Sequence, residues 1–345
     1  MSHTDQNRKH YIDNLRWLTI LLLFPYHTFM IFNSWGEDFY IRGSSVDVLG
    51  YIILFLSSFM MPLLFVIAGI SSSHALQNRT PAQFIKERVS KLLVPLIFGL
   101  LIVIPVQSYL AELFHFGEGS YFNFFTKFGD LTGYTGGFTP GQLWFIAYLF
   151  VISLIALPFM LLYKKRGNGT FGAKFPFAVV VLIGILLPYA HMILNISGKS
   201  LGEYLALFLF GFFILSRDAV VSKLTKYRWI LLGLFAVSWI IRIILWTHEF
   251  WETHEWLAVL CVLGFGQKHL NFSGKFSSYM SKAAFGVYIF HQSLIVIAGY
   301  FIFTLTDKIL IQVPVIMAFS IVFSFALYEL CKRVKPLRRM FGLKK

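Results

Sequence analysis

The chain contains ten long apolar segments separated by short polar ones, and this pattern constrains its fold more than any other feature. A membrane-spanning helix needs about 20 mostly apolar residues. With 57% hydrophobic and only 13% charged residues, the chain has too little charge to cover the surface of a water-soluble domain of this size. We therefore predict an all-α integral membrane protein, with a membrane domain at residues 1–331 and a basic cytoplasmic tail at residues 332–345. The expected spans are residues 11–33, 48–74, 92–114, 143–163, 175–195, 201–216, 229–247, 254–268, 284–305 and 309–331.

The positions of the Lys and Arg residues predict how these spans are oriented. If the N-terminus lies in the cytoplasm, 24 of the 30 Lys and Arg residues fall in cytoplasmic segments, four fall outside and two lie within spans. This is the positive-inside pattern, and one missed or invented helix would reverse every later segment and remove it. The sequence thus predicts about ten transmembrane helices with cytoplasmic N- and C-termini, in a multi-pass protein of the cell (inner or plasma) membrane. The net charge of +14 then reflects topology, so no nucleic-acid partner is expected.

Ionisable residues inside the first span are candidates for function, because charge at membrane depth is costly. Arg16 and His27 are eleven positions apart, which places them within about 20° of one helix face and about 16 Å apart along the axis. Asp13 lies three residues before Arg16 and can share its charge. A functional pair on one face is our first interpretation. A snorkelling arginine and a packing histidine are the alternative.

Two later spans also contain polar residues. Tyr288 and His291 are one helical turn apart and face the same direction. They either line a polar path or make hydrogen bonds between helices. Arg242 lies in the middle of the seventh expected span, where an unpaired charge is hard to accommodate, and it is a further candidate for the acceptor site or cavity.

Basic residues cluster at the cytoplasmic start of the third span. Lys86, Arg88 and Lys91 would suit a phosphate-bearing cytosolic ligand, because Arg and Lys supply charge-assisted hydrogen-bond donors. Ordinary positive-inside charge explains the same residues. The tail at residues 332–345 is open to two interpretations as well, a segment attracted to anionic headgroups of membrane lipids or a bare stop signal.

Two outer segments have a less specific composition. The segment 247-THEFWETHEW-256 contains two His and three Glu, but its spacing matches no defined zinc pattern, so we expect a solvated loop or an interfacial belt and no metal site. The stretch at residues 115–141 is the longest outer loop. It is a candidate lid at the membrane surface.

Four segments together resemble the membrane-bound acyltransferase-3 family, which modifies cell-surface glycans. They are 13-DNLRWLTILLLFPYH-27, in which ten residues separate an Arg from a His, 84-FIKERVSKLLVP-95, 141-GQLWFIAYL-149 and 278-SYMSKAAFGVYIFHQSL-294. In the second segment the family's second arginine is Lys91 here, which keeps the charge but loses bidentate geometry. The segments occur in order and on the expected helices.

The resemblance implies an acyltransferase with acyl-CoA as a cytoplasmic co-substrate and no bound cofactor. Arg88, Lys91 and Lys86 would bind the phosphates of CoA, and Arg16 would lie at the entrance. His27 would be the general base for the acceptor hydroxyl, or would transiently bear the acyl group.

The acceptor implied by the resemblance is a hydroxyl of a cell-envelope glycan or lipid-linked glycan. Tyr288 and His291 would position the acceptor or the thioester, and Gln142 and Trp144 at the outer opening would contact sugar.

The closest-looking branch is the glucan-succinylating type, without a fused extracytoplasmic hydrolase-like domain. A separate extracytoplasmic partner enzyme is therefore conceivable. The alternative function is a transporter or flippase of a lipid-linked glycan, although paired Gly/Pro-broken helices do not occur at matching places in two halves of the sequence.

Overall fold

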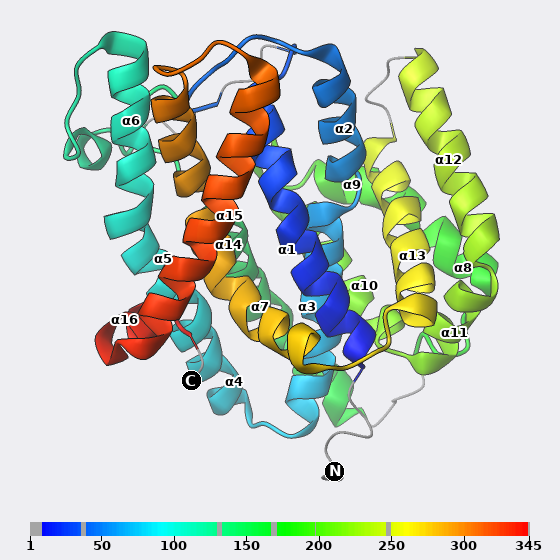
Figure 1. Ribbon diagram of the computed structural model, residues 1–345. Helices are drawn as coiled ribbons and strands as arrows, with labels where there is room; N and C mark the ends of the chain where they lie inside the picture. The colour runs from blue at the N-terminus through cyan, green and yellow to red at the C-terminus, as the bar shows by residue number, and fades with distance from the viewer. Residues whose placement is uncertain are drawn as a thin grey trace. The chain divides into compact units, whose positions relative to one another are not determined.

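The computed structural model describes residues 9–35, 39–129, 133–166, 171–196, 198–245 and 250–343. Among these residues, almost all regular structure is helical, as the sequence predicts (Figure 1). The one sheet that they form is a short antiparallel hairpin of β1 (Asn195–Ile196) and β2 (Lys199–Ser200).

The helices follow one another along the chain with few long interruptions. The α-helices are α1 His10–Met30, α2 Asp47–Ser57, α3 Met60–Gln77, α4 Pro81–Arg88, α5 Val94–Phe98, α6 Ile104–Phe116, α7 Trp144–Lys165, α8 Phe177–Leu182, α9 Leu187–His191, α10 Leu201–Phe210, α11 Asp218–Lys226, α12 Arg228–Leu245, α13 Trp251–His269, α14 Lys275–Ile302, α15 Ile309–Arg333 and α16 Lys335–Met340. The π-helical turns are η1 Val89–Leu93, η2 Gly99–Val103 and η6 Gly211–Leu215, and the 3-10 turns are η3 Asn123–Thr126, η4 Gly141–Leu143 and η5 Ile183–Leu186.

Each of the ten predicted spans overlaps one helix or a run of consecutive helices. Six of these runs, within the residues described, are long and apolar enough to cross a membrane: Asp47–Gln77, Pro81–Phe116, Gly141–Lys165, Arg228–Leu245, Lys275–Ile302 and Ile309–Arg333. A seventh is added if Leu201–Leu215 and Asp218–Lys226, which meet at a bend of 96°, form one span. The protein is thus an all-α membrane protein, and ten spans with cytoplasmic ends remain a prediction.

The span expected at 48–74 corresponds to the single run Asp47–Gln77, in which only Ser58 and Phe59 separate α2 from α3. Two of the predicted boundaries differ clearly from the structure. The ninth helix begins at Lys275 rather than at residue 284, because its polar first turns are helical. The span expected at 175–195 ends at His191 and is interrupted by η5. Pro188 lacks the N–H that would bond to the carbonyl of Gly184, and this carbonyl instead accepts a hydrogen bond of 3.3 Å from the hydroxyl of Thr253.

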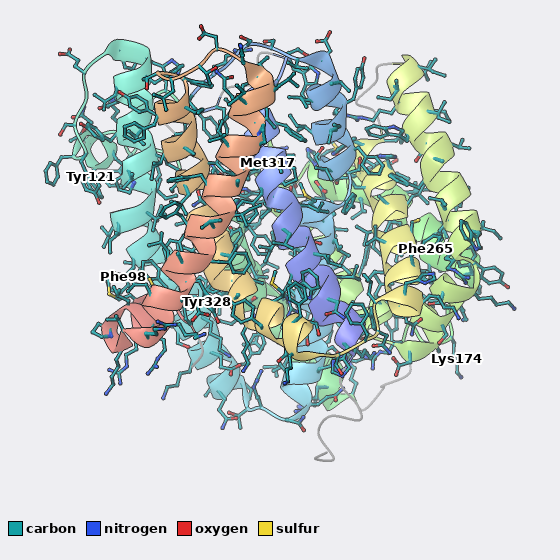
Figure 2. All side chains as sticks on the ribbon, viewed as in Figure 1. Phe98, Tyr121, Lys174, Phe265, Met317 and Tyr328 are labelled. Atoms are coloured by element: carbon teal, nitrogen blue, oxygen red, sulfur yellow. The ribbon has the colours of Figure 1, made fainter. Side chains whose placement is uncertain are left out.

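Two prolines also shape the run from Pro81 to Phe116. Pro95 follows η1 and Pro105 follows η2, and each proline removes one backbone hydrogen bond and crowds the carbonyl four residues earlier. The wider π turns accommodate this crowding. The carbonyl of Leu101, four residues before Pro105, accepts a hydrogen bond of 2.6 Å from the hydroxyl of Tyr121. Figure 2 labels this tyrosine. The hydrogen bond attaches the outer loop to the helix.

The helices group into two compact units, each of which is described by itself. The first unit is Met1–Trp17, Ser57–Lys86 and Tyr148–Ser278, and the second is Leu18–Leu56, Glu87–Ala147 and Tyr279–Lys345.

Close helix packing in the first unit depends on glycine. Gly69 of α3 faces the carbonyl of Phe208, and Gly211 of η6 faces the carbonyl of Val66, so that a Cβ at either glycine would collide with backbone. Small residues at helix interfaces are the usual means of close approach in a membrane, where packing replaces the hydrophobic drive. These contacts place α3 directly against α10 and η6 (Figure 1).

Segments of the first unit that the charge pattern assigns to the cytoplasm contact one another. Lys9 forms an ion pair with Asp218 at 2.6 Å and donates to the carbonyl of Ser216. Lys164 donates to the carbonyl of Leu76 over 2.7 Å. The ends of these helices therefore meet on one side of the unit.

Candidate active site

Two histidines from distant parts of the sequence lie side by side in the second unit. His27 is near the end of α1 and His291 is in the middle of α14, and their ring centroids are 5.1 Å apart. The ring of Phe39 stacks on His27 at 6.0 Å, and the ring of Phe24 meets His291 edge-on at 5.8 Å. His291 is fully buried and His27 partly buried. The sequence proposed both histidines, but not that they would meet.

The hydrogen bonding of His291 defines its proton position. Its Nδ1 lies 2.6 Å from the carbonyl oxygen of Tyr288, and a carbonyl only accepts, so Nδ1 must be the protonated nitrogen. In the neutral ring, Nε2 then has the free lone pair. Neither this Nε2 nor the buried Nδ1 of His27 has a hydrogen-bond partner among the residues described. Buried nitrogens left unpaired cost about 1–3 kcal/mol each, which indicates that they bind something else.

A buried amide network supports α14 next to the histidines. The side chain of Gln142 donates to the carbonyl of Ile289 over 2.7 Å, and the hydroxyl of Tyr288 donates to the backbone carbonyl of Gln142. Gln107 of α6 donates to the side-chain oxygen of Gln142 at 3.3 Å and to the hydroxyl of Tyr40 at 2.8 Å. The polar groups of Gln142 and Tyr288 are thus used within the protein.

The same network attaches α6 to α14. Ser293 donates to the side-chain oxygen of Gln107 at 3.0 Å and to the carbonyl of Val103 at 3.2 Å. Gly141 has φ +49, and a Cβ there would meet the side-chain nitrogen of Gln107 and the hydroxyl of Tyr40. A residue other than glycine would therefore be strained and would displace the amide. Sequence reasoning missed Gln107, although a glutamine within an apolar segment is a usable signal.

A single buried carboxylate holds the outer loop at the end of α6. Glu112 is 3% exposed and accepts hydrogen bonds from the backbone of Ser120 at 2.9 Å, from Asn123 at 2.7 Å and from Lys127 at 2.9 Å. The ring of Tyr134, also in this loop, packs on the site residue Tyr40 at 5.3 Å. The loop thus contacts the amide network, as expected of a lid. Asp130 lies outside the described residues.

The contact predicted between Arg16 and Asp13 at the start of α1 is present in the first unit. Arg16 donates to Asp13 over 3.0 Å, as the spacing of three residues predicts. It also donates to the hydroxyl of Ser71 on α3 over 2.8 Å, a contact that the sequence did not indicate.

The basic element at residues 84–95 continues from α4 into η1. Lys86 is exposed, while Arg88 and Lys91 are partly exposed. Lys91 forms an ion pair with Glu87 at 3.2 Å, which sequence reasoning overlooked. Such surface pairs contribute only about 0–1 kcal/mol, so Glu87 holds the Lys91 ammonium weakly.

Of the two expectations for residues 247–256, a solvated loop or an interfacial belt, the solvated loop is wrong for residues 251–256. Trp251 begins α13, and Glu252, His254 and Glu255 are all buried. Arg242 belongs to this part of the first unit, where its guanidinium lies 3.5 Å from the centroid of the Trp251 ring. Arg242 thus contacts the start of α13 within the first unit. His248 and Glu249 lie outside the described residues.

The burial of these acidic groups is explained by partners that are distant in sequence. His191 Nδ1 lies 2.6 Å from Glu203 and 3.0 Å from Glu252. The ligand atoms of these three residues lie within 4.8 Å of one another, and their types suit a divalent metal. The imidazole is at hydrogen-bond distance from both carboxylates, so the three side chains form one largely buried cluster. Trp144, proposed for the outer opening, begins α7 and is partly buried.

Comparison with known protein families gives one match, and it covers nearly the whole chain. The model of an acyltransferase domain, that of the acyltransferase-3 family, matches residues 9–329. Comparisons with curated proteins and with solved structures gave no match. Together with the apolar helices, the match indicates a multi-pass membrane protein. The chain belongs to the acyltransferase-3 family and is an acyltransferase that transfers groups other than aminoacyl groups.

Proposed function

We propose that this protein is a membrane O-acyltransferase that moves an acetyl or succinyl group from cytoplasmic acyl-CoA to a hydroxyl of a cell-envelope glycan or lipid-linked glycan. The observation on which this rests is the pair His27 and His291, whose unpartnered ring nitrogens lie together in a chain of the acyltransferase-3 family. The cell membrane is the proposed location, with a separate extracytoplasmic enzyme as a possible partner.

The chemistry follows from what a neutral imidazole can do. His27 accepts the proton of the acceptor hydroxyl as its oxygen attacks the thioester carbonyl carbon. The C–S bond then breaks, the CoA sulfur takes up a proton, and the glycan ester is released. A positioned base of this kind contributes about 10²–10⁴-fold. His27 acting as a transient acyl carrier is the second route, in which the imidazole attacks first and the hydroxyl second.

His291 has the better-defined proton position of the two. Because its Nδ1 donates to the carbonyl of Tyr288, its Nε2 has the lone pair of the neutral ring. We propose that this nitrogen accepts a hydrogen bond from the acceptor hydroxyl. Alternatively, it receives from His27 the proton that His27 has taken from this hydroxyl. Gln142 and Tyr288 hold α14 in the required place through their hydrogen bonds.

The donor side rests on charge. Lys86, Arg88 and Lys91 form a basic element for the diphosphate and 3′-phosphate of CoA, the strongest anions that the donor presents. Arg16, held by Asp13 and Ser71, adds a cation at the start of α1. No metal or bound cofactor is part of this proposal.

The test uses purified protein in lipid nanodiscs with acetyl-CoA or succinyl-CoA, labelled in the acyl group, and isolated envelope glycan. We expect free CoA thiol to appear only when glycan is present, and the label to reach the glycan as a hydroxylamine-sensitive ester. His27→Ala protein provides the background rate. If wild-type protein releases CoA no faster than this background with both donors, the proposed reaction is wrong, and movement of glycan without acylation would favour a transporter.

A further inference from the structure

The C-terminal tail forms a compact turn rather than an extended segment. The last span ends at Val334, whose extended backbone (φ −86, ψ 113) turns the chain into α16. Beyond α16, the backbone N–H of Leu343 donates to the carbonyl of Arg338 at 2.9 Å, and that of Gly342 donates to the carbonyl of Arg339 at 3.2 Å. The residues after the last span therefore have a defined conformation.

One side of this turn packs on the helix that contains His291. Phe341 is only 4% exposed, and its ring lies 5.0 Å from that of Phe290. Leu343 lies against Gly286, at which a Cβ would come within 3.1 Å of the leucine side chain. Gly286 and Phe290 are four residues apart and share one face of α14. The tail thus contacts the helix of Tyr288 and His291 over a full turn.

The other side of the turn packs on the basic element. Gly342 has φ +61, and a Cβ there would lie 2.8 Å from the ring of Pro95, 3.3 Å from the carbonyl of Ser90 and 3.4 Å from the Cα of Lys91. A positive φ and this close approach both favour glycine. The tail therefore holds the π turn η1 from one side, and Figure 1 shows α16 beside α5.

The basic residues of the tail divide into two kinds. Lys332 and Arg333 both face Glu329, at 2.7 Å and 3.8 Å, so their charge is offset. Arg338 and Arg339 have no carboxylate partner among the residues described, and they belong to the turn that contacts Lys91. Two guanidinium groups thus lie on the turn adjoining the basic element without an acidic neighbour.

We infer that the segment Lys335–Leu343 is part of the acyl-CoA site, where it fixes the π turn containing Lys91 and adds Arg338 and Arg339 as contacts for the nucleotide phosphates. This inference rests on the proposed function. A tail that only met anionic headgroups would not need a buried Phe341 or a left-handed Gly342 fitted to Pro95. Arginine is suited to phosphate because its planar fork can donate two parallel hydrogen bonds.

The experiment compares the double variant Arg338→Ala/Arg339→Ala with Lys344→Ala/Lys345→Ala, which removes the same charge from the end of the chain. Initial rates are measured in nanodiscs with acyl-CoA and with the corresponding acyl-pantetheine, which lacks the nucleotide phosphates. The arginine variant should raise the KM for acyl-CoA about 10-fold or more, equivalent to about 1.4 kcal/mol, with kcat little changed. Its KM for acyl-pantetheine and both constants of the lysine variant should change less than about 2-fold.

A second variant tests the role of the turn without removing charge. Gly342→Ala should displace Pro95 and η1, and so raise the KM for acyl-CoA while leaving that for acyl-pantetheine unchanged. Thermal unfolding and gel filtration check that each variant is folded.

Equal effects on the two donors would show that the tail is only structural and would overturn the inference. If the two double variants change the KM for acyl-CoA equally, and this change depends on the anionic lipid content of the nanodisc, the tail is attracted to lipid headgroups and the inference is overturned. If wild-type protein releases no CoA from acyl-CoA, the proposed function itself fails. If wild-type protein is active and every tail variant matches it, only the role of the tail fails.

Discussion

The buried carboxylate of Glu112 offers a direct test of how the outer loop is held. Replacing Glu112 by Gln keeps the shape but removes the charge and leaves one acceptor oxygen where there were two. The carboxylate now accepts three hydrogen bonds, from Ser120, Asn123 and Lys127, one of which is also an ion pair. The amide oxygen of the glutamine can accept hydrogen bonds at only one of the two carboxylate oxygen positions. At the other position its NH₂ group then faces a hydrogen-bond donor.

The expected magnitude follows from these contacts. Hydrogen bonds to charged groups contribute about 1.5–3 kcal/mol, and the lower cost of burying a neutral amide offsets part of the loss. We therefore expect the closed loop to lose about 2 kcal/mol relative to the open loop. This corresponds to about a 30-fold larger open population, since 1.4 kcal/mol is a factor of ten.

Hydrogen exchange of the loop amides measures this population. The N–H of Ser120 donates to Glu112, so its exchange rate should rise about 30-fold in Glu112→Gln protein. Glu118→Gln, on an exposed carboxylate of the same loop, is the matched control and should exchange like wild type. Equal protection of Ser120 in both variants would refute the idea that Glu112 holds the loop.

Three further predictions concern topology, the donor and the amide network. A single cysteine at Lys308 should react with an impermeant reagent from outside intact cells, and one at Lys226 only after lysis; outside labelling at position 226 would break the ten-helix count. Arg88→Lys should raise the KM for acyl-CoA and not for acyl-pantetheine, because it removes a phosphate-binding fork; equal changes would place the phosphates elsewhere. Gly141→Ala should lower stability by about 1–3 kcal/mol in a thermal or denaturant assay, because φ is positive and a Cβ would meet the buried glutamine amide. Gly233→Ala, whose Cβ would meet nothing, is its control and should be neutral or stabilising.

The fold was predictable as far as it depends on local composition. Apolar segments of spanning length became helices, because a chain in lipid must satisfy its backbone hydrogen bonds internally. The start of α13 was not predictable in this way. The composition around Glu252 and His254 predicted a solvated loop, yet both residues are buried. Glu252 contacts His191, about sixty positions earlier, and a local pattern contains no information on such a partner.

The candidate site was likewise predictable from local sequence only in part. His27 and His291 were each identified as polar residues at membrane depth, but their contact depends on helix packing across most of the chain. Gln107 was not predicted, because it is not ionisable. A buried amide nevertheless needs hydrogen-bond partners as an ionisable group does. Tyr40 gave no signal, since an aromatic residue in a loop is unremarkable in sequence. The tail appeared to be a charge cluster because its anchor, Phe341, is a single apolar residue among basic ones.

The central claim is that the paired histidines perform acyl transfer, and single-turnover kinetics test it most directly. Saturating labelled acyl-CoA and glycan are mixed with wild-type, His27→Asn, His291→Asn and His269→Asn protein, the last altering an exposed histidine in the first unit as a control. Asparagine keeps hydrogen bonding but cannot take up a proton at neutral pH. We predict that His27→Asn slows ester formation by about 10²-fold or more, that His291→Asn also slows it, and that His269→Asn does not. Ester formation by folded His27→Asn protein at a rate near that of wild type would show that His27 is a packing residue and would contradict the mechanism.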